Sequence, residues 1–266
     1  MTLVLSPALD RFRRAYGAHR ATEGRDYSGA DLLALPYLTS GPLARQWSVR
    51  ARTFDAFMSH VVGPAARSRA RPLRVLDLGA GNGWLSHRLA GKGHTCLAVD
   101  IRDDAVDGLG VAQCFPPGAM FQTLLASFDA LPLPPDYADI AVFNAALHYA
   151  TDLEATLAEA IRVVQPGGAI VILDTPFYAH EEAGFAMVSE KHTRARANFG
   201  HRAEALLSLP FIEFLTRDRL ARASPGMLWR RQPVRYPLWY EARPVIARLR
   251  GQRPPSRFDL WMAVVA

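Results

Sequence analysis

The chain has 266 residues, half of them hydrophobic, and a formal net charge of +6. This length suits one α/β domain with additions, and the apolar content is sufficient to bury a core. The only cysteines, Cys96 and Cys114, exclude both a disulfide framework and a paired-cysteine zinc site. The apolar start is shorter than a secretory signal, and no apolar run reaches the length of a bilayer span. We therefore expect a soluble protein of the reducing cytoplasm.

Almost all of the positive charge is arginine, because Lys92 and Lys191 are the only lysines. A biased base composition of the source genome explains this pattern. A surface that binds phosphates or acidic partners through guanidinium groups explains it equally. The sequence leaves both explanations open.

Two amphipathic helices are predicted within residues 1–71. In the first, apolar residues that include Phe12 and Tyr16 recur at helical spacing among charged residues. The second begins after Pro42 and is expected to stop near Pro64. We interpret residues 1–71 as a helical cover with no fold of its own.

Short apolar runs alternate with helical segments over residues 72–175. This alternation is typical of a parallel sheet whose strands are joined by crossover helices. The clearest helix, DLEATLAEAIRVVQPGG, ends at a Pro-Gly-Gly break. Five strands wound in this way predict a Rossmann-like, doubly wound α/β fold. The predicted strands are LRVLDLG, TCLAVD, MFQTLLAS, DIAVFN and AIVILDT.

After residue 175 the regular alternation breaks. Residues 176–215 have helical spacing and are rich in histidine, arginine and aromatic residues. Thr216 is a suitable N-cap for the helix that follows, with Asp218 near the positive end of that helix. We expect residues 216–266 to complete the sheet, and the strand candidates there are LWRRQPVRYPLWYEARP and FDLWMAVVA.

A glycine-rich turn follows the first predicted strand in VLDLGAGNGWLSHRLA. Such a turn lets backbone approach a ligand, and the following helix N-terminus supplies N–H groups and partial positive charge. Dinucleotide sites use Gly-x-Gly-x-x-Gly, whereas the glycines alternate here, at Gly79, Gly81 and Gly83. Trp84 stands at the last glycine position of that fingerprint. Asp77 would repel a pyrophosphate and attract an ammonium group. The turn therefore predicts a ligand that carries a positive charge close to Asp77 and needs no phosphate.

S-adenosylmethionine has the required groups, namely an α-ammonium, a carboxylate, a sulfonium and a ribose. Asp100 ends the second predicted strand, where a carboxylate can accept hydrogen bonds from both ribose hydroxyls. Asp77 then serves the amino-acid end of the ligand, and Asp100 serves the sugar. We therefore expect S-adenosyl-L-methionine as the cofactor and S-adenosyl-L-homocysteine as its product.

The chain resembles the class I S-adenosylmethionine-dependent methyltransferases, in particular the small-molecule branch that includes the ubiquinone and menaquinone C-methyltransferases. The resemblance lies in VLDLGAGNG, LAVD, LPLPPDYADIAVFNAALHY and RVVQPGG. It makes residues 72–175 the cofactor-binding core and residues 176–215 a substrate lid, which we call the lid segment. It also implies a seven-stranded sheet whose last strand, FDLWMAVVA, is antiparallel.

The resemblance implies cofactor contacts along the carboxyl ends of the strands, where open α/β sheets bind ligands. In relatives an aspartate often holds the adenine amino group, but Ser127 occupies that position here. Phe128 either stacks on adenine or packs in the core. The expected cofactor-binding residues are Asp77, Gly79, Ala80, Gly81, Gly83, Asp100, Ile101, Ser127, Phe128, Asn144 and Ala145.

Methyl transfer from a sulfonium is an in-line displacement, so the protein must align the nucleophile with the methyl group and exclude water. His148 is the candidate general base, since imidazole titrates near neutral pH, and a positioning role is the alternative. The histidines lack ligand-like spacing, so we expect no metal. The expected substrate-pocket residues are Tyr149, Phe177, Tyr178, His180 and His192, with His201 in the same segment, unless that segment is only a solvated helix. Tyr37, Trp47, Arg50 and Arg52 lie either at the methionine end of the cofactor or on the surface.

The sequence thus predicts S-adenosylmethionine-dependent methyl transfer to an oxygen, nitrogen or carbon atom of a small molecule. The arginines between Arg217 and Arg253 suggest RNA or protein as an alternative substrate, although the chain shows no separate module for nucleic-acid recognition. A further alternative is a non-catalytic protein that binds S-adenosylmethionine. The fourth predicted strand lacks the Asn-Pro-Pro-aromatic signature associated with methylation of adenine in DNA. The sequence does not define the oligomeric state.

Overall fold

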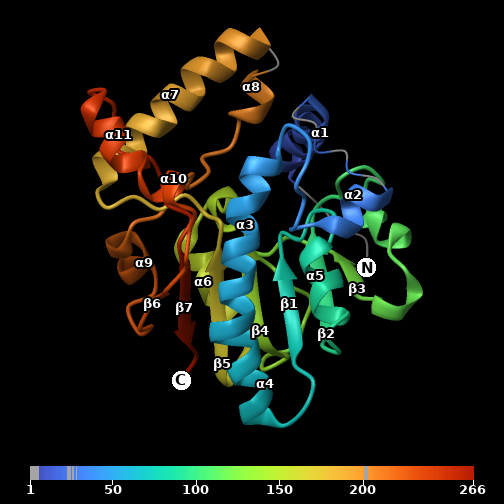
Figure 1. Cartoon of the computed structure of the whole chain (residues 1–266). Helices are drawn as coiled ribbons and strands as arrows, with labels where there is room; N and C mark the ends of the chain where they lie inside the picture. Colours follow the sequence, from blue (N-terminus) through green and yellow to red (C-terminus); the bar gives the residue numbers. More distant parts are fainter. Residues whose placement is uncertain (1–5, 23–24, 26, 28, 201–202) are drawn as a thin grey trace.

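The computed structural model describes residues 6–22, 25, 27, 29–200 and 203–266. The strands of the described residues form one seven-stranded sheet, in which the first five strands along the chain are parallel and the last is antiparallel to both of its neighbours (Figure 1). The predicted Rossmann-like fold with an antiparallel last strand is confirmed. In spatial order the strands are β3 (Gln122–Leu125), β2 (Thr95–Asp100), β1 (Arg74–Leu78), β4 (Ala138–Asn144), β5 (Val164–Leu173), β7 (Leu260–Val264) and β6 (Arg230–Gln232).

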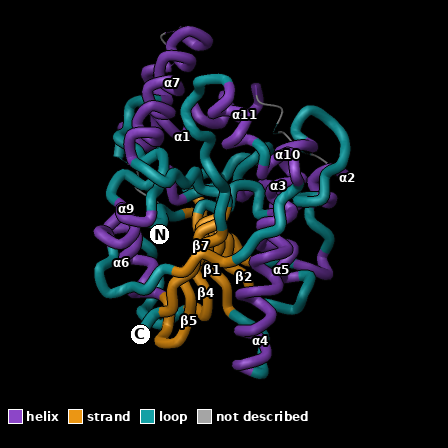
Figure 2. Tube along the Cα trace, turned by 60° about the vertical axis from the view of Figure 1, so that its left-hand side comes forward, coloured by secondary structure: helices purple, strands orange, loops and turns teal. Residues whose placement is uncertain are grey.

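The central strands are apolar along their length because helices cover both faces of the sheet (Figure 2). In β4 every residue from Ala138 to Phe143 is buried, and only the last residue, Asn144, is partly exposed. The two faces form two separate hydrophobic clusters. One cluster includes α3 (Ala44–Phe57), α4 (Gly63–Arg69) and α5 (Trp84–Ala90), and the other includes α6 (Leu153–Val163) and α9 (Arg217–Ala223).

The second predicted helix does not stop near Pro64. A π-helical turn, η1 (Met58–Val62), joins α3 to α4, and Gly63 and Pro64 are the first two residues of α4. Proline is tolerated in the first turn of a helix, where its missing N–H has no partner to lose. The wider turn, closed by a hydrogen bond from the Gly63 N–H to the Met58 carbonyl, carries the chain into α4 without a break.

Most of the strand candidate at residues 228–244 is not a strand. β6 covers only three residues, and the stretch LWYE forms α10 (Leu238–Glu241), which is followed by α11 (Arg243–Leu249). Pro233 directly follows β6 and has no N–H to donate to a strand ladder, so the strand ends there.

Helices from distant parts of the chain lie above the carboxyl edge of the sheet (Figure 1). Phe12 and Phe211 pack edge-to-face between the first helix and the lid segment, with ring centroids 4.6 Å apart. No helix among the described residues combines the length and apolar character needed to cross a membrane. The helices at this edge are α1 (Pro7–Thr22), α2 (Gly29–Ala34), α7 (Glu181–Phe199) and α8 (Ala203–Leu206), and the shorter helical turns of the chain are η2 (Leu109–Cys114), η3 (Pro117–Ala119) and η4 (Leu147–Tyr149).

Gly184 lets α7 pack closely on the ring of Phe214. A Cβ atom at Gly184 would lie 2.2 Å from Phe214 Cε2. We predict that Gly184→Val lowers the free energy of unfolding by about 1 to 3 kcal/mol, the usual cost of overpacking. The matched control is Ala186→Val on the exposed side of the same helix, which costs only about 0.5 kcal/mol of helix propensity. Equal unfolding free energies of the two variants in urea denaturation would contradict this packing.

Candidate cofactor and acceptor site

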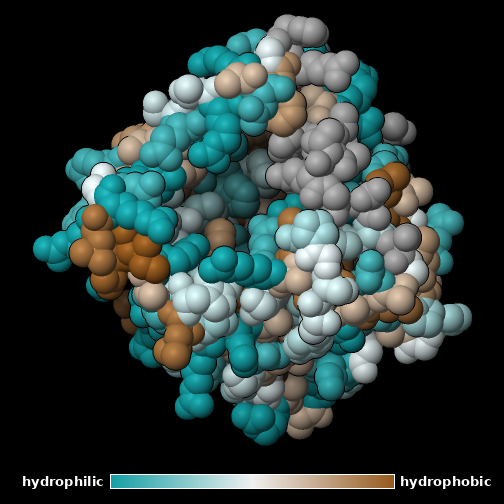
Figure 3. Space-filling model, turned by 45° about the horizontal axis from the view of Figure 1, so that its top comes forward, coloured by the Kyte–Doolittle hydropathy of each residue, from teal (hydrophilic) through white to brown (hydrophobic). Residues whose placement is uncertain are grey.

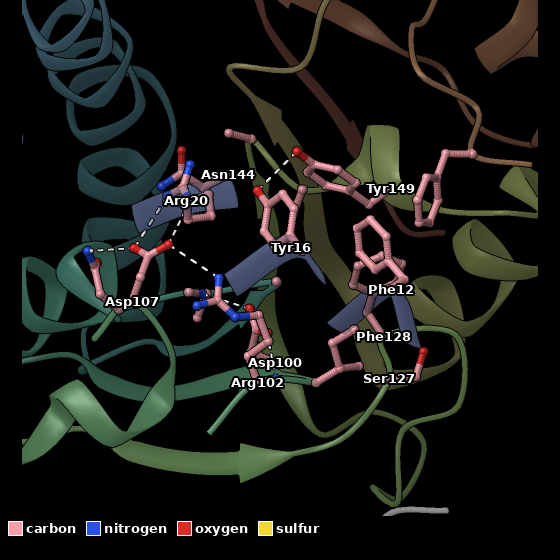
Figure 4. Close-up of a pocket in the computed structure, with 18 of the residues that line it drawn as sticks. Phe12, Tyr16, Arg20, Asp100, Arg102, Asp107, Ser127, Phe128, Asn144 and Tyr149 are labelled. Atoms are coloured by element: carbon pink, nitrogen blue, oxygen red, sulfur yellow. Dashed lines mark hydrogen bonds and ion pairs between the residues drawn. The ribbon is translucent and has the colours of Figure 1, made fainter. Parts of the chain in front are cut away.

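A first cavity, of about 220 Å³, opens at the carboxyl edge of the sheet. The ends of β1, β2 and β4 and the loop after β3 line it, together with residues of α1 and α3 (Figure 4). Open α/β sheets bind their ligands at this edge. The expected cofactor residues that line the cavity are Gly79, Ala80, Gly81, Asp100, Ile101, Ser127, Phe128, Asn144 and Ala145.

A hydrogen bond ties the glycine turn to the end of β2. The Gly81 N–H donates to Asp100 Oδ2 at 2.8 Å, and the Arg102 N–H donates to Oδ1 at 2.9 Å. Gly81 has a φ of +56°, in the left-handed region that favours glycine. Burial raises the pKa of Asp100, while the two N–H donors act in the opposite direction. Each carboxylate oxygen can accept a second hydrogen bond, so Asp100 can still bind hydroxyl groups of a ligand.

Four N–H groups of the turn, those of Gly79, Ala80, Gly81 and Gly83, donate to acceptors within the protein. Gly79 and Ala80 both donate to the Val99 carbonyl, at 2.8 and 3.0 Å. The first N–H of α5, that of Trp84, donates to the side chain of Asn82 at 3.2 Å. The turn therefore shapes the cavity, and a ligand carboxylate needs a cation from elsewhere.

Asp77 and Gly83 lie behind the lining of the first cavity. Asp77 is fully buried, accepts a hydrogen bond from Ser86 Oγ at 2.9 Å and keeps its Oδ1 without a hydrogen-bond partner. Burial raises the pKa of Asp77 to about 7. Gly83 is required by packing, because a Cβ atom there would lie 2.5 Å from the ring of Phe121. Asp77 thus supplies negative charge behind the turn rather than a surface for direct contact.

Arginines from the N-terminal helices face the acidic wall of the first cavity. Arg20 of α1 donates from Nε to Asp107 Oδ2 at 2.6 Å, and Arg102 Nη1 lies 3.3 Å from the same oxygen (Figure 4). Arg50 of α3 lines the cavity, and its Nε lies 3.9 Å from Asp174 Oδ2. Burial lowers the pKa of Arg50, which shows that its charge is poorly solvated. An anionic ligand group beside Arg50 would therefore be stabilised.

The loop after β3 lines another side of the first cavity. The Phe128 ring packs edge-to-face on Phe143, with centroids 5.7 Å apart, and also lines the cavity. Asp129 lines the cavity as well, although it was not among the expected residues because it is displaced by two positions from the aspartate of relatives. It accepts a hydrogen bond from the Thr156 hydroxyl, and burial raises its pKa. A flat ring beside a carboxylate suits a heterocycle with an amino group.

Helix α1 supplies cavity residues that the sequence reasoning missed. Phe12, Tyr16 and Arg20 are four residues apart, which places them on one side of the helix, and all three line the first cavity (Figure 4). The hydroxyls of Tyr16 and Tyr149 are 3.0 Å apart and share a hydrogen bond. Burial raises the pKa of Tyr149 well above its usual value, so this phenol stays protonated. The helical spacing was visible in the sequence, but the surface that it covers was not.

A second cavity, of about 190 Å³, adjoins the first, and His148 lines it. Burial lowers the pKa of His148 to about 3, with smaller contributions from Lys191 and other cations, and Nδ1 has no hydrogen-bond partner. The ring is therefore neutral at physiological pH and is a weak base. This property does not favour the predicted role of His148 as general base. The two cavities share Tyr16, Arg20, Arg50, Ala145 and Tyr149.

The structure does not bring the two aromatic candidates at the start of the lid segment to these cavities. Phe177 is buried in the core and stacks on Trp261, with ring centroids 5.2 Å apart. Tyr178 is also buried, and its hydroxyl accepts a hydrogen bond from Arg253 Nη1 at 3.0 Å. Both residues anchor the start of the lid segment on the sheet.

The candidate histidines of the lid segment lie elsewhere. His180 is exposed directly before α7, His192 is half-buried on α7 and lines neither cavity, and His201 lies outside the described residues. Tyr37 and Arg52, which were considered for the methionine end of the cofactor, are exposed, whereas Trp47 and Arg50 line the first cavity. Within the described part of the chain, no three histidine, cysteine, aspartate or glutamate side chains are arranged to hold a metal ion.

Residues 76–172 match a family model described as a methyltransferase domain. This segment contains the glycine turn, Asp100, Phe128 and Asn144, which line the first cavity. This part of the chain is therefore similar to a methyltransferase domain, in agreement with the resemblance seen in the sequence.

Two curated proteins illustrate the similarity. The chain is 28% identical over 177 residues to the malonyl-[acyl-carrier protein] O-methyltransferase of Hahella chejuensis, with 62% of each chain covered. It is 37% identical over 114 residues to a ubiquinone/menaquinone biosynthesis C-methyltransferase of Vibrio vulnificus, with 40% of this chain and 43% of that protein covered. The matches thus span less than two thirds of the length of these relatives.

A solved structure shares the fold. It is the 1,6-didemethyltoxoflavin-N1-methyltransferase of Burkholderia thailandensis with bound 1,6-didemethyltoxoflavin and S-adenosylhomocysteine. The TM-score is 0.53 at 17% sequence identity, and the match covers all of this chain and 92% of that one.

The raised pKa of Asp77 predicts that S-adenosylhomocysteine binding releases protons near pH 6.5. In the free protein Asp77 is partly protonated at this pH. A ligand ammonium favours the ionised carboxylate and lowers its pKa, so the bound state holds fewer protons. Calorimetric titration in two buffers of different ionisation enthalpy measures the release. We expect Asp77→Asn to lose it and Asp136→Asn, an exposed site between β3 and β4, to keep it. Unchanged proton release in Asp77→Asn would rule out this linkage.

Proposed function

We propose that the protein is an S-adenosylmethionine-dependent methyltransferase that acts on a small molecule. The first cavity carries this proposal, because it gathers three groups that match three parts of the cofactor. Asp100 suits the ribose hydroxyls, Phe128 suits the adenine ring and Arg50 suits the methionine carboxylate. The similarity of residues 76–172 to a methyltransferase domain supports the same assignment.

The remaining polar groups of the site fit the amino-acid end of the cofactor. Asn144 lines the cavity, and its Oδ1 is buried without a hydrogen-bond partner. We assign this oxygen to the cofactor ammonium, with the negative charge of Asp77 behind the turn as support. Asp129 is assigned to the adenine amino group. It supplies the carboxylate that relatives have at the position of Ser127, whose side chain is uncharged.

When bound, S-adenosylmethionine supplies an electrophilic methyl group on its sulfonium for in-line displacement. The chain contributes alignment and the exclusion of water. Phe12, Tyr16 and Tyr149 line the first cavity and border the neighbouring space, so their rings cover the region where an acceptor would meet the cofactor. A nucleophile held against these rings is shielded from solvent.

Neither His148 nor Tyr149 is suited to remove a proton at neutral pH. His148 is a weak base with a pKa of about 3, and Tyr149 remains a neutral phenol because burial raises its pKa. The acceptor therefore attacks through a group that needs no strong base, such as a carboxylate, an ionised phenol, a thiolate or a neutral amine.

The alternatives receive less support. The arginines proposed to bind RNA or protein are in several cases neutralised by carboxylates of the same chain. A protein that binds the cofactor without catalysis would be expected to have a blocked acceptor site. Here two further cavities adjoin the first one and leave room for an acceptor. The ion pairs are Arg222 with Glu181, Arg231 with Asp259, and Arg253 with Glu190.

Cofactor binding tests the proposal directly. We predict that Asp100→Asn weakens S-adenosylhomocysteine binding by about 10-fold to 100-fold, since hydrogen bonds to a charged group contribute roughly 1.5 to 3 kcal/mol. Asp136→Asn, at the opposite edge of the sheet, should bind as the wild type does. Isothermal titration measures both constants. Unaltered affinity of Asp100→Asn would remove Asp100 from the cofactor site.

A further inference from the structure

A third cavity, of about 390 Å³, lies between α1, α7 and α8. It meets the first cavity at a shared wall of four aromatic side chains from α1, the end of η4 and the lid segment. Figure 3 shows this end of the molecule hollowed, and most of the coloured residues at the edge of the hollow are hydrophilic. The shared residues are Phe12, Tyr16, Tyr149 and Phe211.

The wall of the third cavity is apolar on several sides. Met187, Ala195 and Phe199 project from one face of α7, at spacings of eight and four residues, and Leu206 and Leu207 line it from α8 and the residue after it. A cavity of this kind stabilises a ligand mainly by removing apolar surface from water. The ligand body that fits it is therefore hydrocarbon or aromatic.

The charges that line the third cavity are not balanced. Arg253 pairs with Glu190 at 2.8 Å, and Lys191 pairs with Glu213 at 2.6 Å. Arg194 also lines the cavity, and it lies close enough to Glu190 to lower the pKa of that carboxyl, but the salt bridge of Glu190 is made with Arg253. One positive charge is thus left beside an apolar cavity, which complements a ligand with one anionic group.

We propose, building on the methyltransferase function above, that the methyl acceptor is an amphipathic small molecule. Its apolar body occupies the third cavity, and its anionic group pairs with Arg194. The aromatic wall of Phe12, Tyr16, Tyr149 and Phe211 then lies between this body and the cofactor cavity, at the point where the reacting atom meets the methyl group. The lid segment thus selects an acceptor by its apolar surface area and by its negative charge.

The test uses the full chain saturated with S-adenosylhomocysteine and three linear probes with eight carbon atoms each: octanoate, octyl phosphate and octan-1-ol. Isothermal titration measures each affinity. We expect octanoate or octyl phosphate to bind about 10-fold more tightly than octan-1-ol, as for one charge-assisted hydrogen bond. The tighter of the two anions identifies the anionic group as carboxylate or phosphate.

Two variants separate the contribution of the Arg194 charge to probe binding from that of the apolar cavity. Arg194→Gln should bind the anionic probes no better than octan-1-ol, whereas Arg196→Gln, on the same helix but paired with Glu204, should keep the preference. Ala195→Trp should fill the cavity and weaken all three probes while S-adenosylhomocysteine still binds, which shows that the variant is folded.

Equal binding of the three probes to the wild type would overturn the proposal, and so would an anion preference that survives in Arg194→Gln. Tight probe binding to Ala195→Trp would exclude the third cavity as the site. The S-adenosylhomocysteine titration reports on the methyltransferase function, and the probe titrations report on the acceptor site. The two proposals can therefore fail separately.

Discussion

Negative charge buried at the carboxyl edge of the sheet is the constraint on which the rest of the structure depends. Asp77, Asp107 and Asp174 are buried there, and Asp100 lines the first cavity beside them. An ionised carboxylate in such surroundings is costly unless hydrogen-bond donors or cations face it. Burial accordingly raises the pKa of Asp77, Asp100 and Asp174. A ligand with an ammonium and a sulfonium reduces this cost.

Helices α1 and α3 supply the cations that the acidic wall needs. Arg20 comes from α1 and Arg50 from α3, so electrostatics helps to hold the N-terminal helices over the sheet. The same α1 carries Tyr16, whose hydroxyl meets that of Tyr149, and these two rings border all three cavities. One helix thus neutralises the first cavity and also forms part of the third. The two binding functions that we propose for the site share a single structural element.

Short-range patterns predicted the sheet and many of the residues that line the first cavity, because strand ends and glycine turns have a local geometry that the sequence determines. Asp100 and Phe128 were expected from their places after the second and third strands, and both line the cavity. Long-range packing was not predictable in this way. The spacing of α1 indicated a buried face but not that Arg20 would reach the cavity. An aromatic residue such as Phe177 can pack in the core as readily as it can line a pocket, and here it stacks on Trp261. Gly83 matched the ligand-binding pattern, yet it packs against Phe121 behind the cavity lining.

A crystal structure of the protein with S-adenosylhomocysteine tests the central claim most directly. We expect the ligand in the first cavity, with its adenine beside Phe128, its ribose hydroxyls on Asp100 and its carboxylate next to Arg50. Density for the ligand in another cavity, or in the first cavity with the sugar away from Asp100, would contradict the proposed site.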